Sequence, residues 1–236
     1  MRPGRFLGGV WSERSRLFIT MKIIKAVIFE PVGCLAEFRA EEFDAIAARL
    51  FEVSGVSPSG SEAYWNLLGR IEGAGKKLSA SETQMAEGLE LQAVEQARLY
   101  EDVVPALEEL KSMGVDLLIA SSLSTAAVSR FLGKSSLASF FSAVWTRDSA
   151  GGIKAVPIAK AIESAAIPPG YAMVLVDTID SIQMAKQMRT NSILMINDYD
   201  QGKRLAGQDP TGAVVSLHEL PDAIRFVVES AKLPHA

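Results

Sequence analysis

The chain has 236 residues, of which 48% are apolar and 22% charged, so it can bury a substantial core and is not disordered as a whole. Its net charge of -4 and the absence of a long basic cluster argue against a nucleic-acid partner, because phosphate backbones are bound by a basic face. Its single cysteine, Cys34, cannot form an internal disulfide, and no apolar run is long enough to span a bilayer; we expect a cytoplasmic protein without membrane contact.

Residues 1–20 carry four arginines against one glutamate but lack the continuous apolar segment of a secretory signal. We interpret them as a disordered leader. An organelle-targeting peptide and an overextended start are the alternatives. Met21 then begins the approach to the first predicted strand.

Short apolar runs of strand length recur along the rest of the chain, and helix-length amphipathic segments separate most of them. Strands and helices that alternate in this way predict an α/β fold, a doubly wound Rossmann-like parallel sheet with helices on both faces. The strand-length runs cover residues 26–29, 116–120, 142–145, 172–176, 192–196 and 213–216.

The stretch 37–99 breaks the alternation, because it has helical patterns but no convincing strand. An apolar stripe around Phe43–Phe51 predicts one helix, and two more are expected near 62–71 and 82–99. We therefore expect an all-helical cap over 37–99, inserted into a core made of 21–36 and 100–236. Tyr64 and Trp65 lie on the second of these helices, where we expect them to pack in its core.

Four polar residues follow predicted strands, at the edge where parallel sheets bind their ligands. Glu30 ends the first strand, Ser121 ends the second, and Asp177 ends 172–176, while Lys154 follows 142–145 and its loop. We expect these four side chains to meet at one edge of the sheet.

The run Ala26–Leu35, Ala-Val-Ile-Phe-Glu-Pro-Val-Gly-Cys-Leu, resembles the first motif of the haloacid dehalogenase (HAD) superfamily, in which four apolar residues precede Asp-x-Asp-Gly-Thr-Leu. Ser121, Lys154 and Asp177 match the three later motifs in order and approximate spacing. The helical insert resembles the small cap of the phosphoglycolate phosphatase and β-phosphoglucomutase branch. The resemblance covers the chain from Met21 onward and implies a phosphoryl-transfer pocket that uses Mg²⁺. We expect weakened Mg²⁺ binding here and no other cofactor.

Both aspartates of the first motif are replaced here, by Glu30 and Val32. In the family the first aspartate attacks phosphorus and the second protonates the leaving oxygen. Glutamate reaches one methylene further, and a misplacement of about 1 Å can cost on the order of a hundredfold in rate. Valine transfers no proton, although acid–base help is worth roughly 10²–10⁴ in rate. Pro31 between them also removes a backbone N–H that could hold phosphate.

The resemblance assigns three roles to residues of this chain. Hydroxyl and amide donors bind phosphoryl oxygens, a lysine neutralises their charge, and carboxylates suit Mg²⁺. The catalytic residues are then Glu30, Ser121 and Lys154, the substrate-binding residues are Ser122, Gly33 and Thr178, and the Mg²⁺ ligands are Glu30, Asp177 and Asp180.

Helix capping offers a structural alternative for several of these residues. The serine pair 121–122 would then cap a helix that begins near Ser124, and Asp177 and Asp180 would cap a helix over 181–188. For Cys34 we expect a small buried thiol, and for 197–202 a turn at the same edge of the sheet.

Three functions fit these patterns. We favour a HAD-like protein with a degenerate site, inactive or very slow, that binds a small phosphorylated ligand or has a regulatory role. The first alternative is a Mg²⁺-dependent phosphatase of small phosphate esters, and the second is a structural or dimerisation module. The sequence names neither a substrate nor an oligomeric state.

Overall fold

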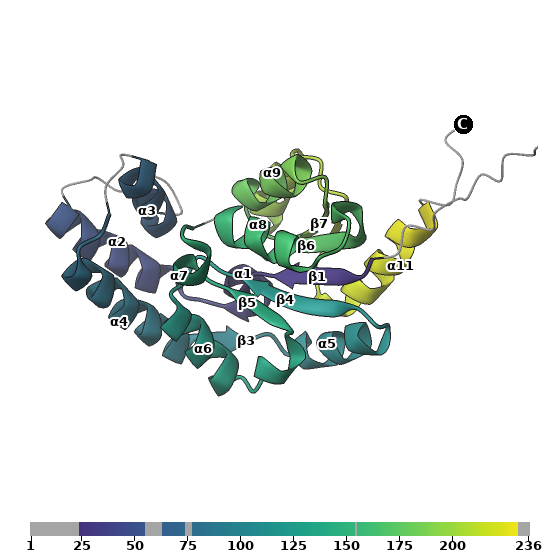
Figure 1. The fold of residues 1–236 in the computed structure, drawn as a ribbon, viewed down its shortest axis with the longest axis horizontal. Coiled ribbons are helices and arrows are strands. Elements are labelled where there is room, and N and C mark those ends of the chain that lie inside the picture. Colours follow the sequence, from purple (N-terminus) through teal and green to yellow (C-terminus); the bar gives the residue numbers. More distant parts are fainter. Residues whose placement is uncertain (1–23, 55–62, 74–76, 154, 231–236) are drawn as a thin grey trace, which may run out of the picture.

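The computed structural model describes residues 24–54, 63–73, 77–153 and 155–230, and its centre is a six-stranded sheet in the order β5-β4-β1-β6-β7-β8 (Figure 1). All neighbouring strands in it run parallel. The prediction of a doubly wound α/β sheet is confirmed, and each strand lies within two residues of its predicted bounds. These strands are β1 (Ala26–Phe29), β4 (Asp116–Ala120), β5 (Ala143–Trp145), β6 (Ala172–Val176), β7 (Asn191–Met195) and β8 (Gly212–Val214).

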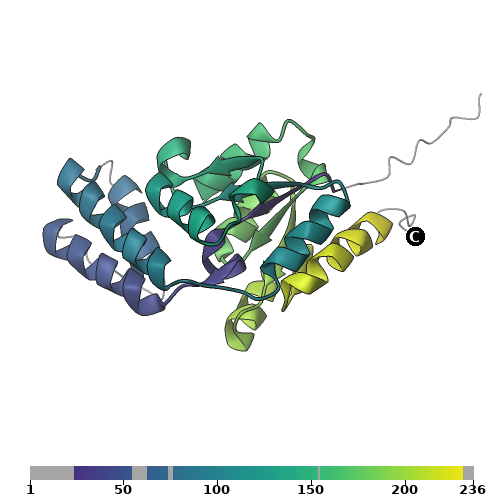
Figure 2. The same ribbon diagram turned by 90° about the horizontal axis from the view of Figure 1, so that it is seen from below.

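Helices cover both faces of the sheet, which explains why β1 is apolar at every position. Val27 and Phe29 point into one buried cluster, whereas Ala26 and Ile28 point into the other. In both ribbon views α5 lies beside α11 (Figures 1 and 2), while α8 and α9 pack on the opposite face. The core helices are α5 (Val103–Ser112), α6 (Thr125–Lys134), α7 (Arg147–Ala150), α8 (Ala155–Ser164), α9 (Ile179–Gln187), α10 (Tyr199–Ala206) and α11 (Leu220–Ser230).

Between β1 and α5 the chain forms a helical unit beside the sheet, which we call the insert (residues 37–99). Its helices are α2 (Ala40–Ser54), α3 (Ala63–Gly73) and α4 (Ala80–Gln96), and α4 packs against both α2 and α6. The prediction of an insert without strands was wrong at its two ends. There β2 (Ala36–Glu37) pairs antiparallel with β3 (Arg98–Leu99), because strands of two residues are too short to leave a periodic pattern.

Helix α4 begins two residues before its predicted start because a capping box fixes its first turn. Ser79 Oγ accepts a hydrogen bond from the Glu82 amide at 3.3 Å, and Glu82 Oε2 accepts one from the Ser79 amide at 2.6 Å. The helix ends at Gln96, and β3 begins two residues later at Arg98.

Two further predictions concern the leader and the lack of membrane contact. The leader, 1–20, lies outside the described residues, so its interpretation stays a prediction. None of the helices in the described ranges combines the length and the apolar character needed to cross a bilayer.

Candidate active site

A cavity of about 190 Å³ lies at the carboxyl ends of β1, β4 and β6, where the strand order reverses. Loops after these strands and the first turn of α9 line it from the core, and α3 contributes one side chain from the insert. The lining residues are Glu30, Pro31, Val32, Trp65, Ser121, Ser122, Asp177, Thr178, Asp180 and Ser181. The structure therefore brings together six of the eight predicted site residues.

Gly33, a seventh, does not line the cavity but supports it from behind. It has a φ of +78°, and a Cβ atom there would lie 1.8 Å from Asp177 Oδ2. Asn197, from the loop after β7, donates a hydrogen bond to the Gly33 carbonyl at 2.6 Å. Only glycine allows the Asp177 carboxylate to approach the backbone of this turn so closely.

Glu30 is held by a chain of hydroxyl groups that starts on α9. Thr178 donates to Ser181 Oγ at 2.8 Å, and Ser181 Oγ donates to Glu30 Oε1 at 2.7 Å. Thr178 is also the N-cap of α9, so the alternative that Asp177 or Asp180 caps this helix was wrong. Asp180 instead lies in the first turn, where the helix dipole favours a carboxylate.

The serine loop, residues 121–124 after β4, reaches the cavity with its first two residues. Ser121 Oγ accepts a hydrogen bond from the Leu123 amide at 3.1 Å, which leaves its own proton available for a ligand. The N-cap of α6 is Ser124, whose Oγ accepts from the Ala127 amide at 3.2 Å. The alternative that Ser121 and Ser122 cap this helix was therefore wrong.

Lys154 lies outside the described residues, so its catalytic role stays a prediction. Among the described lining residues, three are acidic and none is a lysine or an arginine. The part of the site that the structure describes is thus acidic and rich in hydroxyl groups.

The oxygen donors of this cavity fit Mg²⁺ in part. Within the described ranges, no three acidic, histidine or cysteine side chains are arranged to hold one metal ion. Glu30 and Asp177 nevertheless supply two carboxylates, the number at which Mg²⁺ commonly completes its shell with water and phosphate. Asp180, the third predicted ligand, does not complete such a set.

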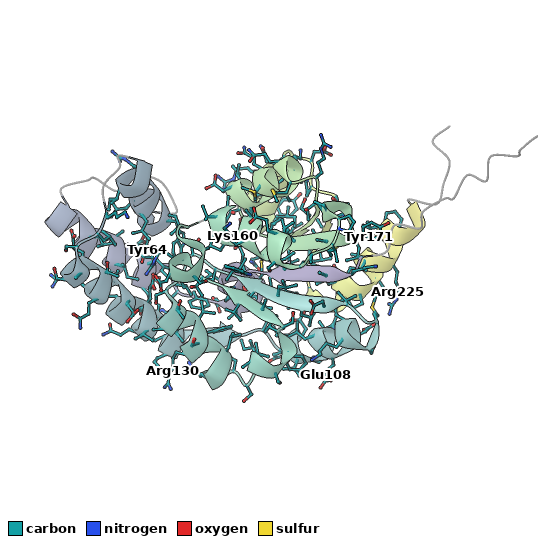
Figure 3. All side chains as sticks on the ribbon, viewed as in Figure 1. Tyr64, Glu108, Arg130, Lys160, Tyr171 and Arg225 are labelled. Carbon is teal, nitrogen blue, oxygen red and sulfur yellow. The ribbon has the colours of Figure 1, made fainter. Side chains whose placement is uncertain are left out.

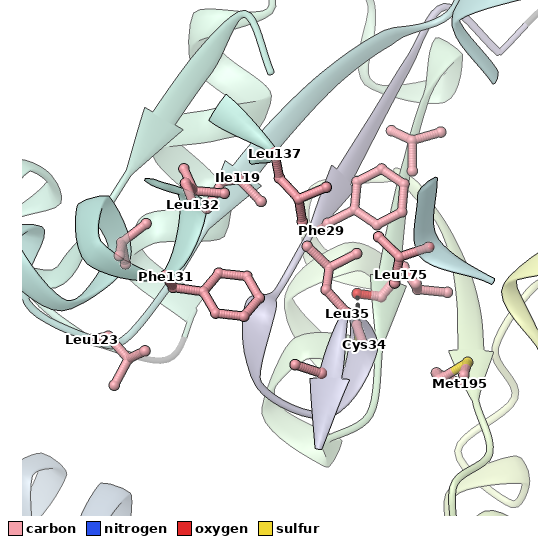
Figure 4. Close-up of a cluster of buried hydrophobic side chains, with 14 of the residues drawn as sticks. Phe29, Cys34, Leu35, Ile119, Leu123, Phe131, Leu132, Leu137, Leu175 and Met195 are labelled. Carbon is pink, nitrogen blue, oxygen red and sulfur yellow. Dashed lines mark hydrogen bonds between the residues drawn. The ribbon is translucent and has the colours of Figure 1, made fainter. Parts of the chain in front are cut away.

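Cys34 is fully buried beneath the site, in agreement with the sequence analysis. Its Sγ donates to the Leu175 carbonyl at 3.6 Å among the apolar side chains shown in Figure 4. Burial raises its pKa well above the ordinary value, and the negative charges of Asp177 and Glu30 raise it further. A thiol that stays protonated at neutral pH is a poor nucleophile, so Cys34 does not carry the chemistry.

Trp65, like Ser181, lines the cavity although the sequence did not predict it there. Its ring packs against Tyr64 at 4.6 Å and Phe43 at 5.2 Å between centroids, as expected of a helix core, yet it also forms part of the cavity wall. Its neighbour Tyr64 lies between the insert and the core (Figure 3). Helical periodicity places both rings on α3 but does not say which one reaches a neighbouring unit.

Comparison with known proteins identifies relatives of this architecture. A family model described as "Haloacid dehalogenase-like hydrolase" matches residues 56–195, a range that begins after the loop of Glu30 and Val32. No curated protein sequence matches.

Solved structures of the same fold have low sequence identity. A predicted phosphatase from Clostridium acetobutylicum has a TM-score of 0.65 at 19% identity, over 86% of this chain and 99% of its own. A predicted phosphoglycolate phosphatase from Haemophilus somnus has a TM-score of 0.62 at 15% identity, with 86% and 98% covered. A HAD phosphatase from Thermococcus onnurineus has a TM-score of 0.58 at 22% identity, with 84% and 96% covered.

Proposed function

Because this chain belongs to the haloacid dehalogenase-like hydrolase family, we propose that it is a slow Mg²⁺-dependent hydrolase of small phosphate esters. One observation carries this proposal. The carboxylate of Glu30 shares a single cavity with Ser121 and Asp177 at the carboxyl ends of three adjacent parallel strands. The solved structures of the same fold, described as one phosphatase and two predicted phosphatases, support the same class of reaction.

In this proposal Glu30 attacks phosphorus and the bond to the ester oxygen breaks. The oxygen leaves as an alkoxide and takes its proton from solvent water, which gives the alcohol. Water then cleaves the resulting acyl phosphate, which releases inorganic phosphate and restores the carboxylate. The hydroxyls of Ser121 and Ser122 donate to phosphoryl oxygens and hold them in place. Glu30 and Asp177 would hold Mg²⁺, which would offset the negative charge of the carboxylates and the phosphate.

Two features of the cavity predict a low rate. Val32 lines the cavity beside Glu30 and has no proton to give to the leaving oxygen. The hydrogen bond from Ser181 stabilises the charged form of Glu30 and so makes it a weaker nucleophile. We therefore expect turnover well below that of a site with two aspartates.

The insert, 37–99, is the proposed cap of this site, over a core of 21–36 and 100–236. Trp65 is the insert residue that lines the cavity. The cavity is smaller than the roughly 300–1,000 Å³ of pockets for drug-sized ligands, so the organic part of the substrate is small. We expect it to contact the indole ring.

The proposal is tested with an aryl phosphate and a panel of small phosphate esters, each assayed with Mg²⁺ and with chelator. The native chain is compared with Glu30→Gln, which keeps the shape of the side chain but removes its charge. Glu108→Gln changes an exposed glutamate on α5 and serves as the matched control. We expect Mg²⁺-dependent turnover in the native chain and the control only. Equal rates in native and Glu30→Gln would refute hydrolysis at Glu30.

A second candidate function is binding of a phosphorylated ligand without turnover. Val32 favours it, because the cavity keeps hydroxyl donors but lacks a proton donor at that position. A ligand at 100 times its Kd should stabilise the native state by about 2.7 kcal/mol. Thermal stabilisation by inorganic phosphate, with no turnover of any ester, would select this function over hydrolysis.

A further inference from the structure

A buried ion pair joins the insert to the core beside the cavity. Glu90 lies in the middle of α4 and Arg147 begins α7, and their side chains are 0% and 11% exposed. Arg147 Nη1 donates to Glu90 Oε1 at 2.6 Å, and Nη2 donates to Oε2 at 3.3 Å. The pair is therefore a forked, desolvated contact between two parts of the chain 57 residues apart.

Further hydrogen bonds use the remaining capacity of the two charged groups. Tyr64 OH donates to Glu90 Oε1 at 2.5 Å, and the Ser124 amide donates to Oε2 at 2.9 Å. Arg147 Nη1 also donates to the Ser122 carbonyl at 3.2 Å. One buried carboxylate thus links α3, α4, α7 and the serine loop.

The network reaches the cavity wall on the side of the insert and on the side of the core. Tyr64 precedes Trp65, the wall residue of the insert, while Ser122 is itself a wall residue of the core. Asp148 adds a contact at the same corner, because its Oδ2 accepts from the Thr125 amide at 2.7 Å. The network therefore reaches both sides of the cavity, although Glu90 and Arg147 are not among its lining residues.

Stability alone does not account for such a network. Replacing a buried ion pair by apolar residues of similar volume is often neutral or stabilising, because desolvation offsets the attraction between the charges. Apolar side chains, however, cannot form directional hydrogen bonds with a carbonyl and an amide of the serine loop.

We propose that Glu90 and Arg147 are positioning residues, which fix Trp65 and the serine loop at their places on the two walls of the cavity. Their hydrogen bonds to Tyr64, Ser122 and Ser124 are the observations that support this positioning role. Its relevance to catalysis or binding rests on the proposed function of the cavity.

Two members of the network, Arg147 and Tyr64, keep their protons over the neutral pH range. Burial lowers the pKa of Arg147, but the Glu90 carboxylate more than compensates, so the guanidinium stays protonated. Burial and the charge of Glu90 raise the pKa of Tyr64 well above its ordinary value, so its hydroxyl continues to donate.

The test uses the full chain carrying Glu90→Leu with Arg147→Met, which removes the network but not the packing. The control is Glu95→Gln. Glu95 lies on α4 like Glu90, and its ion pair with Arg130 of α6, at 2.5 Å, is about half exposed at both side chains. Figure 3 shows Arg130 on the outer surface of α6. If the double variant fails to fold, Arg147→Lys is tested instead, because lysine keeps the positive charge but cannot form the forked pair of hydrogen bonds.

Two measurements report the cavity walls without any phosphate ester. Iodide quenching of Trp65 fluorescence, with Trp11 and Trp145 replaced by Phe, reports the insert wall. Hydrogen exchange at the Leu123 amide, which donates to Ser121 Oγ, reports the serine loop and involves neither mutated residue. We expect stronger quenching and an exchange rate about tenfold higher, the change expected when a charge-assisted hydrogen bond no longer holds the loop.

A folded double variant with native quenching and native exchange would overturn the proposal, as would equal effects in Glu95→Gln. Affinity for inorganic phosphate, measured by calorimetry, is the third measurement. We expect it to fall in the double variant, in which quenching and exchange rise. If the native chain does not bind phosphate, the proposed function fails while the test of positioning stands.

Discussion

Gly33 has two properties that can be separated experimentally: a positive φ and a close approach to Asp177. Gly33→Ala should destabilise the fold by roughly 1–3 kcal/mol through backbone strain and, in addition, displace the Asp177 carboxylate. Gly114→Ala is the matched control, because Gly114 has a φ of +74° but no described atom within 4 Å of the point where a Cβ would lie. Urea denaturation and calorimetry with inorganic phosphate measure the two effects.

The close approach matters if Gly33→Ala loses more stability than Gly114→Ala and also loses phosphate affinity. Equal losses of stability, with unchanged affinity, would show that only the dihedral angle is important at position 33.

The pair Glu30 and Val32 predicts that the site can be restored. Glu30→Asp with Val32→Asp shortens the nucleophile by one methylene and supplies a proton donor on the same loop. We expect the rate of aryl phosphate hydrolysis to rise by about 10²-fold or more, the lower end of what acid–base help contributes. Val32→Asn is the control, since it is polar and of similar size but gives no acidic proton. A folded double variant that stays as slow as the native chain would mean that the surrounding cavity has also diverged.

Helix α4 carries Glu90 and contacts α6, so its first turn offers a test at the scale of an element. Ser79→Ala removes the N-cap of the capping box and should cost about 1 kcal/mol of unfolding free energy. Gln84→Ala, an exposed change on the same helix, should cost much less. Hydrogen exchange should locate the effect in the first turn around Glu82, and a uniform rise along α4 would contradict a purely local cap.

The whole molecule should lose stability at alkaline pH through two buried groups. Burial, together with nearby carboxylates, raises the pKa values of Cys34 and Tyr64 above their ordinary 9.0 and 10.0. Below about pH 7.5 both groups are protonated in the folded and unfolded chains alike. As pH rises further, the unfolded chain releases these protons first, so the unfolding free energy falls by up to about 1.4 kcal/mol per pH unit for each group.

Denaturation curves between pH 7 and 11 measure this slope. Cys34→Ala should flatten it from about pH 9 upward, and Tyr64→Phe from about pH 10, relative to the native chain. The same slope in native and both variants would show that other groups control the alkaline transition.

Much of the fold and part of the site were predictable from the sequence. Apolar runs of strand length place six strands within two residues of their bounds, and polar residues directly after them, such as Glu30 and Asp177, reach one cavity. Ser181 and Trp65 were not predicted as cavity contacts, because a serine at a helix start and an aromatic ring on an apolar stripe have common structural roles. Ser181 and Trp65 line the cavity because the folded chain turns the starts of α9 and α3 toward it.

Sequence alone determined the alternation of strands and helices and the edge at which the polar residues gather, because both follow from local periodicity and from the rule for parallel sheets. The tertiary structure decided which groups touch. Ser181 reaches Glu30 across 151 residues and Arg147 reaches Glu90 across 57. Contacts between such distant positions leave no period in a single sequence, since they arise only when packing of the sheet and the insert brings separate elements together.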